Sequence, residues 1–138
     1  MIDRYTRQEM GVVWDVENKF SKMLEVEVAV AKVQAGMKLI PRKAATLIAS
    51  KGQFSVKRIL EIEKETKHDV IAFVSNVAEN VGEYGRFVHF GLTSSDVLDT
   101  AFSLQVREAG QVLQKSLEFL EKSLKNLVRK QADTICAG

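Results

Sequence analysis

Apolar side chains recur along most of the chain at intervals of three and four residues, the spacing that places them on one face of an α-helix. The first such segment spans residues 16–35. Its apolar positions are Val16, Phe20, Met23, Leu24, Val28 and Ala31. Asp15 stands where an N-cap is expected, and Gly36 is placed to end the helix in the left-handed conformation.

Shorter segments continue the same pattern. A short helix is expected between Pro41, which fits a first turn, and Gly52, which fits an end. The next helix is expected to begin near Ser55 and to end near Thr66. Its inner face is predicted to hold Val56, Ile59 and Leu60. A further helix follows Asp69, a predicted N-cap, and the alternation of a strand is absent there. Its apolar stripe consists of Val70, Phe73, Val74, Val77 and Val81.

The spacing changes near the end of the chain, where apolar positions alternate strictly between four- and three-residue steps. This is the heptad seam of a long helix that packs nearly parallel to other helices. The seam is formed by Val106, Gly110, Leu113, Leu117, Leu120, Leu124 and Leu127. A helix of about 35 residues needs partner helices, and the earlier segments are all shorter. We therefore expect an all-α protein, and we expect this chain to be the front part of a longer one.

The composition fits one core-bearing domain, with 138 residues and 46% hydrophobic content. Basic and acidic residues number 20 and 18, and they are interleaved, which argues against a nucleic-acid surface. No apolar run approaches the roughly 20 residues of a membrane span, and the chain start lacks a secretory signal. The lone Cys136 cannot form an internal disulfide, so we expect a buried bystander in a protein of the reducing cytoplasm.

The stretch HFGLTSSDVLDT, residues 89–100, gathers small polar groups just before the long helix. One interpretation is structural, because Thr or Ser followed three residues later by an acid forms a capping box. The other is functional. The first N–H groups of a helix attract carboxylates and phosphates, hydroxyls of Thr93 and Ser94 can add donors, and Gly91 permits close approach.

Further candidate groups are the two histidines, His68 and His89, each of which precedes a predicted helix. A structural histidine is the commoner outcome, but either ring can donate to an anion or transfer a proton. Two histidines and one distant cysteine give no metal-ligand spacing, so no metal site is expected. Arg4 and Tyr5 offer a planar fork and a hydroxyl suited to phosphate, although an exposed, disordered tail is the default expectation.

Three segments resemble the adenylosuccinate lyases of the fumarase/aspartase superfamily, in the order and spacing of that family. They are RYTRQEM from residue 4, KHDVIAF from residue 67 and HFGLTSSDVLDTA from residue 89. The resemblance implies that Arg4 and Tyr5 bind the phosphate of a succinylated purine nucleotide.

The same resemblance implies that Lys67, His68 and Asp69 contact the substrate, and that His68 assists proton transfer. It further implies that Thr93 and Ser94 hold the succinyl carboxylates, with His89 in a supporting role. The implied reaction is a β-elimination that releases fumarate and needs no cofactor.

The implied fold is an N-terminal helical domain, residues 1–92, followed by the start of a central helical bundle, residues 93–138. The resemblance also implies a homotetramer in which three subunits contribute residues to each active site. Its acid–base histidine and catalytic serine follow later in the chain, so these 138 residues alone are expected to be inactive.

Two other hypotheses stay open. The TS-x-D pattern also occurs in related lactonising cycloisomerases, so another lyase or cycloisomerase of the superfamily is possible. The leucine seam alone is equally compatible with a helical interaction module that has no chemistry.

Overall fold

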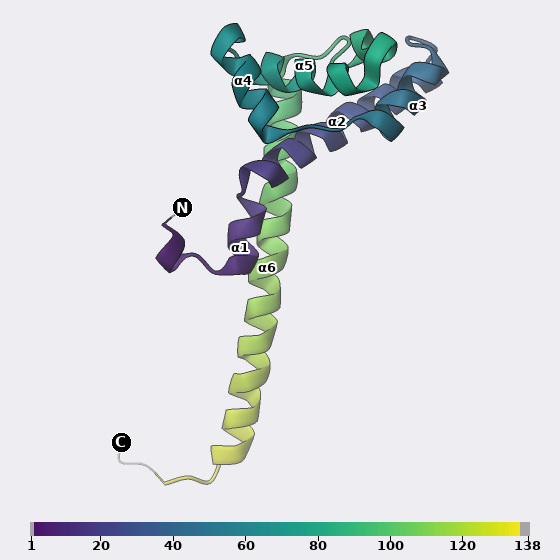
Figure 1. The fold of residues 1–138 in the computed structure, drawn as a ribbon. Coiled ribbons are helices and arrows are strands. Elements are labelled where there is room, and N and C mark those ends of the chain that lie inside the picture. Colours follow the sequence, from purple (N-terminus) through teal and green to yellow (C-terminus); the bar gives the residue numbers. More distant parts are fainter. Residues whose placement is uncertain (1, 136–138) are drawn as a thin grey trace.

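The computed structural model describes residues 2–135, and within them every regular element is helical (Figure 1). The elements are the 3₁₀ turn η1 (Asp3–Tyr5), α1 (Gln8–Val13), α2 (Val16–Gly36), α3 (Arg42–Lys51), α4 (Val56–Thr66), α5 (Asp69–Val81), the 3₁₀ turn η2 (Gly82–Phe87) and α6 (Ser94–Gln131). The all-α prediction is confirmed, whereas η1, α1 and η2 were not predicted. Cys136 lies outside the described residues.

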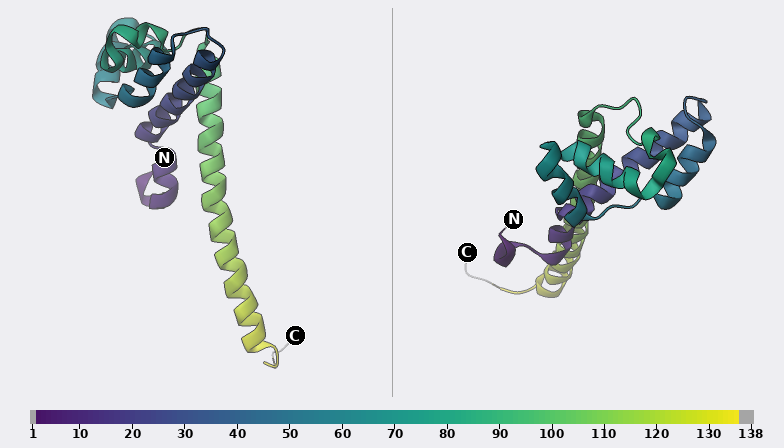
Figure 2. Two further views of the ribbon diagram at one scale, coloured as in Figure 1. Left: turned by 90° about the vertical axis from the view of Figure 1, so that its right-hand side faces the viewer. Right: turned by 45° about the horizontal axis from the view of Figure 1, so that its top comes forward.

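The molecule has two parts. We call α2 to η2 (residues 16–87), together with the start of α6, the head, and the remainder of α6 the rod. Helices α2 to α5 and η2 pack around one end of α6, which extends from the head as a single continuous, gently curved helix (Figures 1 and 2). α2 crosses the upper part of α6 and packs against it, and α1 lies beside α6 below the head. The only part of α6 with buried side chains is therefore its first half, at Val97, Ala101, Gln105 and Ala109.

The core of the head is apolar and aromatic. Phe20 of α2 stacks on Phe73 of α5 with ring centroids 5.6 Å apart, and Phe54 packs against both rings. The largest fully buried side chains are Phe73, Met23, Ile48, Ile59, Val70, Val77 and Val97. The predicted burial of Val16 and Leu60 is wrong, because both side chains are exposed. Ile62 instead takes the inner face of α4.

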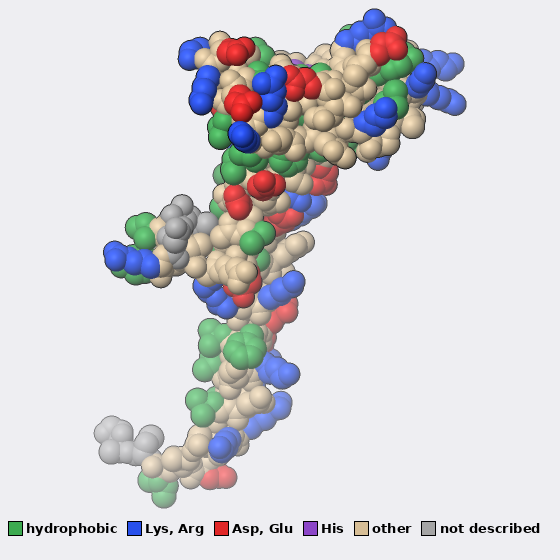
Figure 3. Space-filling view, viewed as in Figure 1, with side chains coloured by type: hydrophobic (Ala, Val, Ile, Leu, Met, Phe, Trp, Pro, Cys, Tyr) green, Lys and Arg blue, Asp and Glu red, His purple; other side chains and the backbone are tan. Residues whose placement is uncertain are grey.

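The predicted seam on α6 lies on the surface of this chain. Its side chains are 47–64% exposed at Val106, Leu113, Leu117, Leu120, Leu124 and Leu127. Figure 3 shows hydrophobic side chains along the lower rod. Nothing in the described part of the chain covers them.

Charge is less evenly distributed than expected. Residues 28–60 contain seven basic residues and no acidic one, so the rest of the chain holds 13 basic against 18 acidic residues. Basic side chains gather around α3 at the upper right of Figure 3. The interleaving expected from the sequence is therefore wrong for this segment. Across residues 2–135, no helix is long and apolar enough to span a membrane.

The end of α2 differs from the prediction. Gly36 is the last helical residue, and the left-handed residue is Lys38, with φ 62°. The Leu39 N–H donates to the Gln34 carbonyl at 2.9 Å, and the Lys38 N–H donates to the Ala35 carbonyl at 3.2 Å. These two bonds form a Schellman motif with lysine where glycine is usual. Pro41 is likewise the N-cap of α3 and not part of its first turn.

We expect Lys38→Gly to raise the free energy of unfolding by about 1 kcal/mol, because glycine adopts a positive φ without the Cβ clash. Lys38→Ala is the matched control, since it removes the charge and keeps the Cβ. Urea unfolding measures the free energy of unfolding of both variants. Equal stability of Lys38→Gly and Lys38→Ala would contradict the explanation from the positive φ.

A polar cluster joins α2 to α6. Glu108 of α6 accepts from Lys22 Nζ at 2.6 Å and from Asn18 Nδ2 at 2.8 Å. Gln105, buried on α6, donates to the Val13 carbonyl at 2.8 Å and so ties the α1–α2 corner to the rod. The hydrogen bond from Lys22, followed by that from Asn18, lowers the pKa of Glu108.

Folding lowers the pKa of Glu108. The Glu108–Lys22 pair therefore stabilises the fold at pH values above the ordinary glutamate pKa. That stability is lost as pH falls through the lowered pKa. Glu108→Gln should cost about 1 kcal/mol at neutral pH, because both side chains are partly exposed and screened. The difference from wild type should shrink below pH 4.5 in urea titrations. Glu121→Gln, in an exposed pair with Lys125, should show little effect at any pH. A pH-independent difference for Glu108→Gln would refute this assignment.

Candidate functional site

The α4–α5 elbow carries the first group of candidate side chains. α4 ends at Thr66, and Lys67 then adopts the left-handed conformation with φ 55° while its N–H donates to the Glu63 carbonyl at 2.8 Å. The next residue, His68, is already the N-cap of α5. Two consecutive residues thus cap two helices, which leaves no linker and holds both exposed side chains at a sharp bend.

His68 has a defined ring orientation. Its Nδ1 accepts the Ile71 N–H at 3.3 Å, so Nε2 is the nitrogen that carries the proton in the neutral ring. The side chain is 43% exposed. Asp69 is not the N-cap that the sequence predicted, because His68 takes that position. The Asp69 Oδ1 atom accepts the Val70 N–H and lies 3.7 Å from His68 Nδ1. The cap therefore presents a possible proton donor to solvent.

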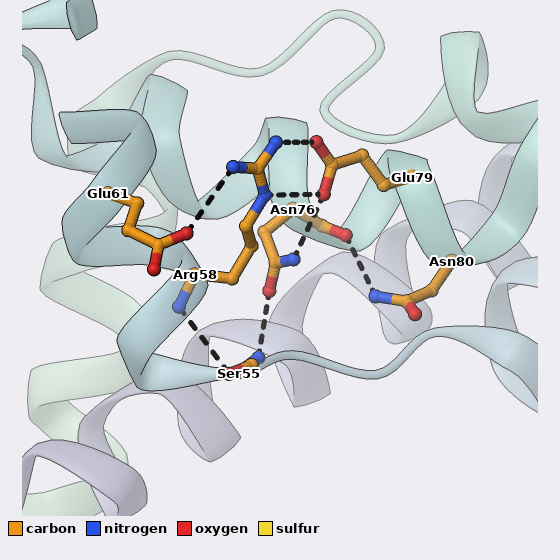
Figure 4. Close-up of polar contacts among 6 residues, drawn as sticks. All are labelled: Ser55, Arg58, Glu61, Asn76, Glu79 and Asn80. Carbon is orange, nitrogen blue, oxygen red and sulfur yellow. Dashed lines mark hydrogen bonds and ion pairs between the residues drawn. The ribbon is translucent and has the colours of Figure 1, made fainter.

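Polar contacts close the other end of the α4–α5 hairpin (Figure 4). Arg58 donates to both carboxylate oxygens of Glu79, at 2.7 and 3.2 Å, which raises the pKa of Arg58 and lowers that of Glu79. Buried Asn76 accepts the Ser55 N–H at 2.8 Å. Asn80 donates to the Gln53 carbonyl at 3.0 Å. These contacts fix the two helices against each other and thereby hold the elbow at 67–68.

We expect His68→Ala to destabilise the chain by about 1 kcal/mol, because the α5 N-cap is lost. His68→Asn keeps an acceptor at the cap and should remain close to wild type. Thermal unfolding of the three chains measures this, and equal loss in both variants would show that the ring contributes something other than a cap.

The start of α6 forms a capping box, the structural interpretation of the TSSD motif. Asp96 accepts the Thr93 N–H at 2.7 Å and the Thr93 hydroxyl at 2.9 Å. The bond from the Thr93 N–H, then that from its hydroxyl, lowers the pKa of Asp96, and the charge of nearby His89 acts in the same direction. Thr93 therefore donates its hydroxyl proton within the chain. Ser94, half-buried, makes no side-chain bond within residues 2–135.

The loop before α6 is held by α2. Glu27 is 2% exposed, and its carboxylate accepts the His89 N–H at 2.8 Å and meets His89 Nδ1 at 2.6 Å. Gln34 donates to the Phe90 carbonyl at 2.7 Å. His89 and Gly91 both have positive φ, 62° and 70°. Sequence reasoning missed Glu27, although it lies four residues after Met23 and so shares the buried face of α2.

The N-terminal candidates lie in η1. The Arg4 guanidinium sits 4.8 Å from the centre of the Tyr5 ring, and Tyr5 is 74% exposed. The Thr6 hydroxyl donates to the Ile2 carbonyl at 2.9 Å and closes this turn. Both side chains are exposed, as the default expectation had it, and the backbone forms a 3₁₀ turn.

The structure does not bring the three candidate groups together. η1 projects to one side below the head, beyond α1, whereas the 67–69 elbow and the start of α6 belong to the head (Figures 1 and 2). Each group presents exposed polar atoms at its own place on the described part of the chain. Among the described residues, no cluster of three or more His, Cys, Asp or Glu side chains could hold a metal ion.

Comparison with known proteins decides the family. A family model described as Lyase matches residues 4–138. The chain belongs to this lyase family. A crystal structure of fumarate lyase from Mesorhizobium sp. BNC1 has a TM-score of 0.85 and 27% identity over 97% of this chain and 33% of its own. The fold is the all-α fold of the fumarase/aspartase superfamily.

Curated relatives are more similar in sequence. The adenylosuccinate lyase of Aquifex aeolicus is 48% identical over the whole of this chain, and that of Bacillus subtilis is 41% identical over the same extent. The adenylosuccinate lyase of Methanocaldococcus jannaschii is 43% identical over 98% of the chain. The chain spans about a third of the length of these relatives, 32%, 32% and 30% respectively.

Proposed function

We propose that this chain is the N-terminal part of an adenylosuccinate lyase. Such an enzyme cleaves adenylosuccinate to AMP and fumarate. It also cleaves the succinylated aminoimidazole carboxamide ribotide to the carboxamide ribotide and fumarate, in cytoplasmic purine nucleotide synthesis. The observation that carries the proposal is 40–48% identity over nearly the whole chain to curated adenylosuccinate lyases of bacteria and archaea.

The roles of individual residues follow from the proposal. In the β-elimination, a base takes the proton from the carbon next to a succinyl carboxylate, a C=C bond forms, the C–N bond breaks, and an acid protonates the leaving nitrogen. The Nδ1 of His68 accepts the cap hydrogen bond, which leaves Nε2 of this partly exposed ring as the donor to substrate. Lys67 and Asp69 flank it as further substrate contacts.

Carboxylate binding is assigned to the start of α6. The N–H groups of a first helical turn and the Ser94 hydroxyl can stabilise charge that spreads onto a carboxylate in the transition state. The Thr93 hydroxyl already donates to Asp96, so only the backbone of Thr93 is assigned to the carboxylate site. Arg4 and Tyr5 are assigned to the phosphate, which a guanidinium binds through paired N–H donors.

Assembly is part of the proposal. The candidate groups are separated within one chain, and the apolar face of α6 is uncovered. Both features support a homotetramer whose bundle buries that face and whose pockets combine groups from several subunits. In this proposal, residues 1–92 form the N-terminal domain and residues 93–138 begin the central bundle.

Complementation tests the function. The chain is co-refolded with the remaining part of the Aquifex aeolicus adenylosuccinate lyase, and fumarate release from adenylosuccinate is followed by absorbance. We expect activity from the mixture and none from either part alone. Ser94→Ala and His68→Asn should each lower kcat by about a hundredfold or more in folded mixtures. A correctly assembled wild-type complex that releases no fumarate would refute the proposal.

A second candidate is a fumarate-releasing lyase with a different leaving group, which the Mesorhizobium structure favours. The two differ in the role of the N-terminus. If the substrate is a nucleotide, Arg4→Ala should raise KM for adenylosuccinate, and AMP should compete. If AMP does not compete with adenylosuccinate and Arg4→Ala leaves KM unchanged, the second candidate is preferred.

A further inference from the structure

The most deeply buried carboxylate in the described chain has no role in the function proposed above. Glu27 lies in the middle of α2, 2% exposed, where the helix faces the loop that leads into α6. A carboxylate in such a position is stabilised only by strong hydrogen-bond donors. Both of its oxygens are used, and both contacts go to His89.

The contact fixes both the backbone and the ring of His89. Oε2 accepts the backbone N–H at 2.8 Å, and Oε1 lies 2.6 Å from Nδ1. An ionised carboxylate only accepts, and with Glu27 in that state the ring carries a proton on Nδ1. His89 is held with φ 62°, a conformation that a residue other than glycine keeps only when its surroundings enforce it.

The ring lies at the start of α6. Its side chain is 21% exposed, and it is close enough to influence Asp96, which caps Thr93. With Nδ1 engaged by Glu27, Nε2 is the ring atom left for a ligand, and within residues 2–135 it makes no hydrogen bond. A protonated ring in this place adds a charge-assisted donor near Asp96, at the start of α6.

We propose that Glu27 is a positioning residue, which orients His89 through Nδ1 so that Nε2 faces the anionic group bound at the start of α6. The carboxylate does not touch the ligand. It sets the tautomer and direction of the ring, as a buried carboxylate does for the histidine of a catalytic triad. This inference rests on the proposed function for the identity of the ligand, a succinyl carboxylate, and on geometry alone for the Glu27–His89 contact.

The contact is tested on this chain by ¹⁵N NMR of the imidazoles, of which there are only two. We expect the wild-type His89 Nδ1 to carry a proton. In Glu27→Gln, the one amide oxygen accepts the His89 N–H and the NH₂ group faces Nδ1, so Nδ1 should lose its proton and Nε2 should keep one. His68 serves as an internal reference in the same spectra.

Gln34→Ala is the matched control, because Gln34 holds the same loop through the Phe90 carbonyl, whereas the hydrogen bonds of His89 go to Glu27. It should leave Nδ1 protonated. A wild-type Nδ1 without a proton would overturn the inference without any variant, and so would an unchanged tautomer in folded Glu27→Gln.

Kinetics of the complemented enzyme test the effect on the ligand. Glu27→Gln should lower kcat/KM for adenylosuccinate by about tenfold or more, mainly through KM, while Gln34→Ala changes it little. An active enzyme in which Glu27→Gln alters neither parameter would refute the positioning role and leave the proposed function intact. A wild-type complex without activity would refute the proposed function, while the NMR result still decides the Glu27–His89 contact.

Discussion

The packing of α2 across the first half of α6 is the interaction on which the other features depend. Glu108 with Lys22 and Asn18, and Gln105 with the Val13 carbonyl, fix the relative position of these two helices. α2 in turn carries Glu27 and Gln34, which hold the loop before α6. The start of α6 is therefore positioned by the same helix that anchors its body, and movement of α2 would disturb both together.

Candidate side chains in the head also stabilise local structure. His68 caps α5, Lys67 ends α4 in the left-handed conformation, and Thr93 caps α6. A cap places a residue at a helix end, where N–H groups are free and the backbone is fixed by the helix behind it. Each such side chain therefore lies on a rigid element, at the boundary where polar groups are exposed.

The helices longer than ten residues could be predicted from the sequence because their apolar spacing extends over several turns. α1 and η2 are too short to show a period, and their positions depend on packing against α6 and α5. Helix ends were less predictable. Lys38 is left-handed in place of Gly36, because hydrogen bonds two residues further on determine where the Schellman motif closes.

Within the candidate site, the sequence indicated the chemical types and missed the contacts. The motifs identified His68, His89, Thr93 and Ser94, but a glutamate amid apolar residues gives no hint of a partner 62 positions away. The choice between capping box and anion site was likewise open, since both use the same residues. The structure shows the capping box at Asp96 and leaves Ser94 available.

The shape of α6 has a mechanical consequence. Its 38 residues make a rod of about 57 Å, and this chain anchors only the half nearest the head. A tilt of about 5° at the head would displace the far end by about 5 Å over that length. A small change of angle at the head is thus amplified along α6, and any neighbour packed on the far half of this helix would set the orientation of the head.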